Sequence, residues 1–188
     1  MRARTCAPRT PLAALARGVV AGAVGTVAMD LLWFYRYKRG GGESSFVDWE
    51  FSAGLDDWSK APAPAQVGKR LFEALFQQEL SPRWVALTNN VMHWMYGLGW
   101  GALYGIVAGS VWLPRVRSGL LFGTVVWTAD YIVLPLAKVY KPMWEYDVPT
   151  LAKDLSAHLV YGLTTATVLR ALTLARSSKP RSPAVKSG

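Results

Sequence analysis

Both histidines of the chain stand at the start of the same short phrase. His93 opens the run His-Trp-Met-Tyr-Gly-Leu, and His158 opens the run His-Leu-Val-Tyr-Gly-Leu. An imidazole titrates near physiological pH and also ligates transition metals, so each phrase can exchange a proton or bind an ion. Tyr96 and Tyr161 follow their histidines by three residues, which on a helix is the same face one turn away. The repetition indicates that the two phrases have related roles.

Three aspartates are placed where they can join these histidines. Asp154 lies one helical turn before His158, so both side chains can reach one ion. Asp30 and Asp130 each stand late in a long apolar segment. An ionisable group at membrane depth is costly unless it faces a partner or water, and a carboxylate beside an imidazole can pass protons. The predicted polar cluster consists of Asp30, His93, Tyr96, Asp130, Asp154, His158 and Tyr161.

Three interpretations of this cluster remain open. In the first, the side chains only join helices by hydrogen bonds of roughly 1 kcal/mol each, and no cofactor is expected. In the second, they bind a metal ion or a haem, with His93, His158 and Asp154 as the ligands. In the third, they bind an ion or conduct protons or small solutes. Four crossings are few for a transporter, so the third interpretation requires a homo-oligomer.

An enzyme is the least supported class. The chain has no Gly-rich phosphate loop, nucleophile elbow or His-Glu-x-x-His motif, so no catalytic residue is assigned.

The elements that must position the cluster are four long apolar segments. Hydrophobic residues make up 52% of the chain and its mean hydropathy is positive. A helix needs about 20 residues to cross about 30 Å of hydrocarbon, and lipid-exposed backbone must satisfy its own hydrogen bonds. We therefore predict an all-α fold, a four-transmembrane-helix bundle that forms one membrane domain over residues 1–174. The helices are expected at about 13–35, 85–113, 118–136 and 151–174.

The repeated phrase divides this bundle into two tandem helical hairpins. Each hairpin has an aspartate late in its first helix and a histidine early in its second helix. Two-helix units keep the same orientation across a membrane, so the two acids and the two imidazoles should meet near one membrane face.

Small residues share helix faces with the polar ones. Spacings of four residues recur along these faces, and small residues at such spacing let helices approach closely in lipid. The cluster should therefore face inward, away from the acyl chains. The predicted helix-packing glycines are Gly18, Gly22, Gly97, Gly101, Gly105, Gly109, Gly119, Gly123 and Gly162.

The first connection is long and contains an amphipathic stretch. Apolar residues recur at helical spacing within residues 66–80, with charged residues on the other faces. This pattern predicts a short helix that either lies on the membrane surface or packs as a lid on the end of the bundle.

Charge predicts the orientation. The net charge is +9, but the unopposed basic residues gather in the N-terminal arm, in the second connection and near the C-terminus. The positive-inside rule then places both termini in the cytoplasm of a cell whose inner membrane holds the chain. We expect the bilayer and its anionic head groups to be the partners of these basic ends, and we expect no nucleic acid. Residues 175–188 are polar and basic, as in a disordered tail.

The phrases Leu87–Gly105 and Lys141–Ala166 resemble small polytopic inner-membrane proteins of bacteria, of an actinobacterial type that is weakly similar to the YagU-like proteins. The resemblance extends over roughly Gly18–Leu172. It implies a multi-pass membrane protein, and since that group has no established activity, it transfers no site residues.

Overall fold

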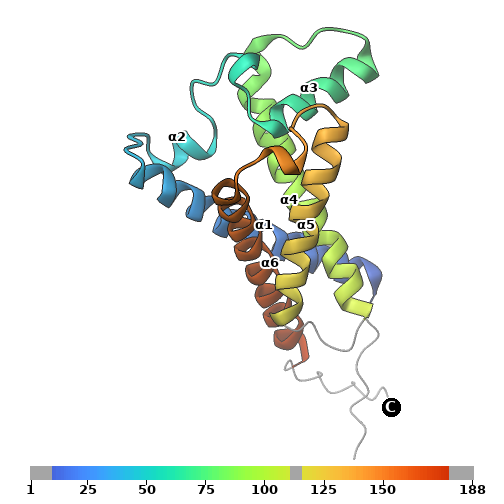
Figure 1. Cartoon of the computed structure of the whole chain (residues 1–188). Coiled ribbons are helices and arrows are strands. Elements are labelled where there is room, and N and C mark those ends of the chain that lie inside the picture. Colours follow the sequence, from blue (N-terminus) through green and yellow to red (C-terminus); the bar gives the residue numbers. More distant parts are fainter. Residues whose placement is uncertain (1–9, 111–115, 178–188) are drawn as a thin grey trace, which may run out of the picture.

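The computed structural model describes residues 10–110 and 116–177, and these form an all-helical fold (Figure 1). Four long helices make up the bundle: α1 (Pro11–Arg39), α4 (Val85–Ser110), α5 (Val116–Leu136) and α6 (Val148–Ser177). The shorter α2 (Phe46–Glu50) and α3 (Ala63–Phe76) lie in the first connection. The all-α prediction is confirmed for the described part of the chain. The N-terminal arm, residues 111–115 of the second connection and residues 178–188 of the predicted tail lie outside it.

Local signals in the sequence explain where the helices begin and end. Thr10 accepts a hydrogen bond from the Ala13 N–H and thereby caps α1. Gly40 closes that helix by donating its N–H to the Arg36 carbonyl at 3.0 Å. Before α6, the Asp147 carboxylate accepts from the Thr150 N–H at 2.7 Å. Both ends of α1 and the start of α6 are therefore specified by local capping as well as by apolar length.

The bundle is built from two antiparallel pairs, α1 with α4 and α5 with α6, which meet where α1 packs on α6. Glycines bring the backbones of each pair together. A Cβ atom added to Gly101 would lie 2.5 Å from the Cα atom of Gly22, and one added to Gly162 would lie 2.6 Å from the backbone nitrogen of Gly123. Such distances are possible only because these residues have no side chain. The two predicted hairpins are thus the two closely packed pairs.

Helices α4 and α5 are held farther apart and are joined by aromatic rings. Phe122 stacks on Tyr104 with ring centroids 4.4 Å apart, and it also contacts Trp100 and Tyr161. These rings form the buried core with small residues from the neighbouring helices. Toward the start of α4, a cavity lies among α1, α4, α5 and α6.

The outer surfaces of the bundle are apolar. Among the described helices, α1 and α5 are long and apolar enough to cross a membrane, which gives two candidate spans where the sequence predicted four. Helices α4 and α6 are of similar length, but α4 includes asparagines and a histidine, and α6 includes charged residues. These polar residues lower the hydropathy of α4 and α6.

Helix α3 packs against the first turns of α4 (Figure 1). A Cβ atom on Gly68 would lie 2.7 Å from the Met92 side chain, so the two helices are in close contact there. The indole of Trp58 donates to the Leu80 carbonyl at 2.9 Å and holds the segment that follows α3. The helix begins at Ala63 and ends at Phe76, earlier at both ends than the predicted 66–80. It lies on the bundle end as a lid, while Leu71 and Leu75 on its outer face are exposed.

Candidate functional site

The first acid–imidazole pair joins α1 to α4. The Nε2 atom of His93 lies 3.1 Å from both carboxylate oxygens of Asp30. Asp30 is buried, with 3% of its surface exposed, whereas 31% of the His93 side chain is exposed. The close glycine contacts of α1 with α4, two turns farther along, fix the helix separation that this pair requires.

The second pair joins α5 to α6 in the same way. His158 Nε2 lies 3.0 Å from Asp130 Oδ2, and His158 Nδ1 lies 2.9 Å from the backbone carbonyl of Asp154. A carbonyl only accepts, so Nδ1 carries a proton, and the contact at Nε2 needs a second proton shared with Asp130. Both ring nitrogens are therefore engaged. Each hairpin thus pairs its own aspartate with its own histidine.

The tyrosines of the two phrases link one hairpin to the other. The Tyr96 hydroxyl donates to Asp130 Oδ1 across the α4–α5 space. The Tyr161 hydroxyl donates to the Gly97 carbonyl at 2.6 Å. Tyr96 of the first phrase thus reaches the acid of the second hairpin, and Tyr161 of the second phrase reaches the backbone of the first hairpin. The repeat of sequence corresponds to a reciprocal set of contacts at the centre of the bundle.

A cavity of about 360 Å³ lies among the four long helices, and the first residues of α3 also line it. All residues of the predicted cluster except Asp30 line it, and Asp30 lies behind His93. Apolar and aromatic side chains form most of the remaining wall, among them Trp33, Trp100 and Tyr140. A mostly apolar cavity with a few convergent polar groups is typical of a small-molecule site.

The acids give this cavity a negative electrostatic character. Burial, together with the negative charges of Asp154 and Asp130, raises the pKa of the Tyr140 hydroxyl to about 12. Three carboxyl groups, those of Asp30, Asp130 and Asp154, face two imidazoles. With these carboxyl groups ionised, the cluster has net negative charge even when both histidines are protonated.

Glu50 belongs to the site although the sequence analysis did not select it. It comes from α2 and is 9% exposed. Glu50, Asp30 and His93 form a group in which one possible ligand atom of each residue lies within 4.8 Å of the other two. Its Oε1 atom is buried without a hydrogen-bond partner. Burial raises the pKa of Glu50, and the neighbouring Asp30 charge raises it further. In the sequence, Glu50 stands out only as an acid between Trp49 and Phe51, and that pattern does not predict that its side chain is buried.

The predicted metal ligands are arranged differently from this group. His158 and Asp154 are adjacent, with Nδ1 3.6 Å from Asp154 Oδ1, but both His158 nitrogens already have partners. His93 pairs with Asp30 on the other hairpin. Among the described residues, the set of three side chains that can share an ion is Asp30, Glu50 and His93.

The packing glycines lie where the pairs need them. Gly18, Gly22, Gly97, Gly101 and Gly105 lie in the α1–α4 contact, and Gly119, Gly123 and Gly162 lie in the α5–α6 contact. The surroundings of Gly109 lie outside the described part of the chain.

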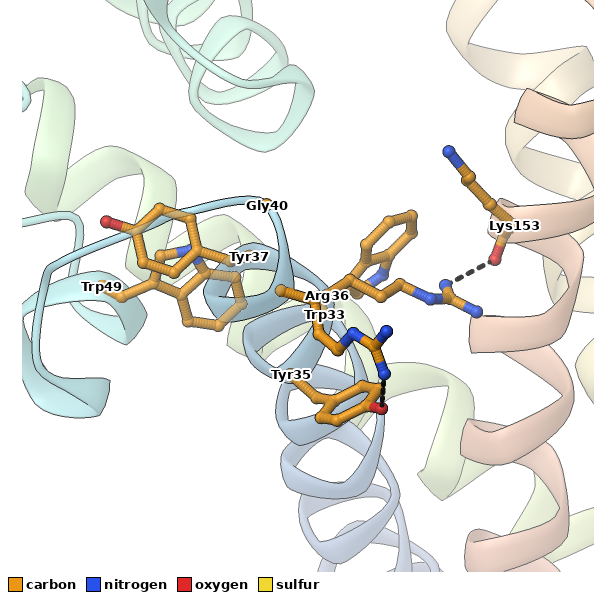
Figure 2. A pocket seen from close by; sticks show the side chains of 8 residues that line it. Trp33, Tyr35, Arg36, Tyr37, Gly40, Trp49 and Lys153 are labelled. Carbon is orange, nitrogen blue, oxygen red and sulfur yellow. Dashed lines mark hydrogen bonds between the residues drawn. The ribbon is translucent and has the colours of Figure 1, made fainter.

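A second, more open hollow of about 670 Å³ lies on the outside, at the end of α1 (Figure 2). Arg36 donates to the Lys153 carbonyl at 2.8 Å and to the Ser156 hydroxyl at 2.7 Å, and thereby ties α1 to α6. Its guanidinium also lies 4.9 Å from the Trp33 ring centroid. Tyr37 and Trp49 form the far wall. This hollow is larger than the inner cavity but holds none of the predicted cluster, so we place the candidate site at the inner cavity.

In the comparisons with family models, curated proteins and solved structures, nothing matches this chain.

Proposed function

We propose that the protein is a four-span integral membrane protein whose inner cavity binds a small organic cation. The observation that carries this proposal is the lining of one cavity by both histidines, by Asp130 and Asp154, and by tryptophan and tyrosine rings. The other proposed features are an inner-membrane location, cytoplasmic termini and basic ends that meet anionic head groups.

Surface chemistry supports membrane insertion of the bundle. On α1 the exposed large apolar residues recur at helical spacing, as at Val20, Val24, Val27 and Leu31. Water would disfavour such a continuous apolar face, whereas lipid accommodates it. The buried side of the same helix holds Thr26 and Asp30, so polar residues face inward and apolar residues face outward.

The same distribution supports α4 and α6 as the other two spans. Helix α4 has no Asp, Glu, Lys or Arg, and it exposes Val91, Met95, Leu103 and Val107. In α6 no such charge occurs between Asp154 and Arg170. At 1.5 Å per residue, both helices are long enough for about 30 Å of hydrocarbon. The two helices turn polar side chains toward the cavity, which is lined by His93, Tyr96, Asp154, His158 and Tyr161.

The composition of the cavity favours a cation over an anion or a neutral ligand. A cation over the face of a Trp or Tyr ring gains about 2 kcal/mol when the site is desolvated, and carboxylates add to this attraction. Asp130 and Asp154 supply carboxylates, while Trp100 and Tyr140 supply aromatic rings. None of the side chains that line the cavity is an arginine or a lysine. A volume of about 360 Å³ suits an organic cation of a few carbon atoms better than a bare ion.

Choline provides a direct test because it has a matched neutral isostere, the alcohol in which carbon replaces the nitrogen. We expect the purified protein in lipid nanodiscs to bind choline about tenfold or more tightly than the isostere, measured by calorimetry. Asp154→Asn should remove most of that preference, and the exposed Asp56→Asn should retain it. Equal binding of choline and the isostere, or binding of neither, contradicts the proposal.

A further inference from the structure

We propose a second site, adjacent to the cation cavity and sharing His93 with its wall, at which Asp30, Glu50 and His93 bind one divalent transition-metal ion such as Zn²⁺. The three side chains come from α1, α2 and α4, far apart in the sequence and brought together only by the fold.

The donor set suits this class of metal. Zn²⁺ and its neighbours in the first transition row accept imidazole nitrogen together with carboxylate oxygen. One ligand atom from each residue lies within 4.8 Å of the others. Ligands around a tetrahedral Zn²⁺ lie about 3.4 Å from one another, as follows from metal–ligand bonds of about 2.1 Å. Closure by rotamer shifts of Glu50 and His93 would therefore complete three positions and leave a fourth for water.

The Glu50 carboxylate is the observation that points to a ligand. Its Oε1 atom is buried without a hydrogen bond, and the residue is 9% exposed. The one neutral donor among the described residues that acts on this carboxylate is the neighbouring indole of Trp94, whose Nε1 atom is also buried without a hydrogen bond. A buried, unpaired carboxylate oxygen is costly, and a second buried carboxylate, that of Asp30, lies beside it. With His93 neutral, the group carries two negative charges, which a divalent ion balances.

The surroundings hold the donors in place and leave a path to the ion. Asp30 is positioned by the close α1–α4 contact. Two hydrogen bonds hold the residues directly after Glu50 against α4. The Asn89 amide donates to the Ser52 hydroxyl, and the Asn90 amide donates to the Phe51 carbonyl. His93 borders the inner cavity, with 31% of its side chain exposed, so an ion or a water molecule can reach it from there.

The test is Zn²⁺ binding by full-length protein that has been stripped of metal and placed in nanodiscs. We expect one Zn²⁺ per chain by calorimetry and by elemental analysis after gel filtration, and no comparable binding of Mg²⁺. Glu50→Gln keeps the shape of the side chain but removes a ligand charge. It should weaken Zn²⁺ binding about 100-fold or more, since even partners beyond the ligands are worth 10–100-fold. His93→Ala should do the same, and the exposed Glu79→Gln should bind like wild type.

Several outcomes overturn the site. The ion binds elsewhere if Glu50→Gln binds Zn²⁺ with wild-type affinity. The same conclusion follows if His158→Asn loses Zn²⁺ binding while Glu50→Gln retains it. The site is excluded if the wild-type protein is folded, as shown by a cooperative thermal transition, and does not bind Zn²⁺. If His93→Ala is misfolded by circular dichroism, Glu50→Gln alone decides. Choline binding is measured on wild type and on Glu50→Gln, because the Glu50 side chain does not line the cavity. Loss of Zn²⁺ binding with choline binding retained then separates the metal site from the cation cavity.

Discussion

Replacement of Gly101 by alanine should separate α1 from α4 and loosen the site. The added Cβ atom would lie 2.5 Å from Gly22 Cα and 2.6 Å from the Gly18 carbonyl oxygen, where ordinary contact begins at 3.4 Å. The helices must therefore part by about 0.9 Å. Both obstacles are backbone atoms, so no change of rotamer relieves the overlap. Overpacking costs about 1–3 kcal/mol, and we expect a value near the upper end.

Gly99 provides the matched control in the same helix. A Cβ atom there meets nothing within 4 Å, so Gly99→Ala should gain helix propensity, about 0.5–1 kcal/mol. The two substitutions are chemically identical and two residues apart, yet the structure predicts opposite signs. The assay is unfolding by sodium dodecyl sulfate in mixed lipid–detergent micelles, followed by circular dichroism.

The same separation should reach the acid–imidazole pair. The two contacts from His93 to Asp30 are 3.1 Å long, and lengthening by 0.9 Å would take them beyond hydrogen-bond range. Gly101→Ala should therefore also weaken Zn²⁺ binding. Wild-type stability in Gly101→Ala, or equal destabilisation by Gly99→Ala, would refute the inferred helix contact.

The remaining predictions concern one hydrogen bond between the two hairpins and one at the start of α6. Tyr161→Phe removes the donor to the Gly97 carbonyl at 2.6 Å and should lower the free energy of unfolding by about 1 kcal/mol in the same assay. The control Tyr35→Phe, at an exposed position, should lower it by less than half of that. Equal losses of stability would contradict the role of the Tyr161 hydroxyl. The hydrogen bonds from Thr150 lower the pKa of Asp147 in the folded protein. The ionised Asp147 side chain therefore stabilises the fold at any pH above its unfolded pKa of about 3.9. This stabilisation is lost as the pH falls through the lower pKa of the folded state. Asp147→Asn should therefore lower Tm at pH 7 and lose that difference in acid; a Tm difference that does not change with pH would contradict this.

Much of the fold could be predicted from the sequence because length and hydropathy dictate the long helices. The described helices α4 and α5 begin within two residues of their expected positions, at Val85 and Val116. The glycine spacing also indicated which faces pack, because close backbone approach has few other solutions. The sequence predicted four membrane spans, whereas hydropathy and length single out two described helices, α1 and α5, as candidate spans. Polar residues lower the hydropathy of α4 and α6.

The site was predicted only in part because its assembly depends on tertiary contacts. The repeated phrase pointed to His93 and His158, which line one cavity. Glu50 was missed because its burial depends on how the first connection folds back on α4, and no periodicity records this. The partners of the tyrosines were also beyond sequence reasoning. Tyr96 and Tyr161 each reach the other hairpin, and spacing within one helix gives no information on that choice.

The central claim, that four spans enclose the cavity, predicts on which side two connections lie. With Cys6 replaced by serine, single cysteines at Glu43 and Lys141 report the connections after α1 and after α5. If α1, α4, α5 and α6 all cross the membrane, a membrane-impermeant maleimide added to intact cells should label both positions from the outer side. If only α1 and α5 cross, the two positions lie on opposite sides, and labelling of one without the other would contradict the account.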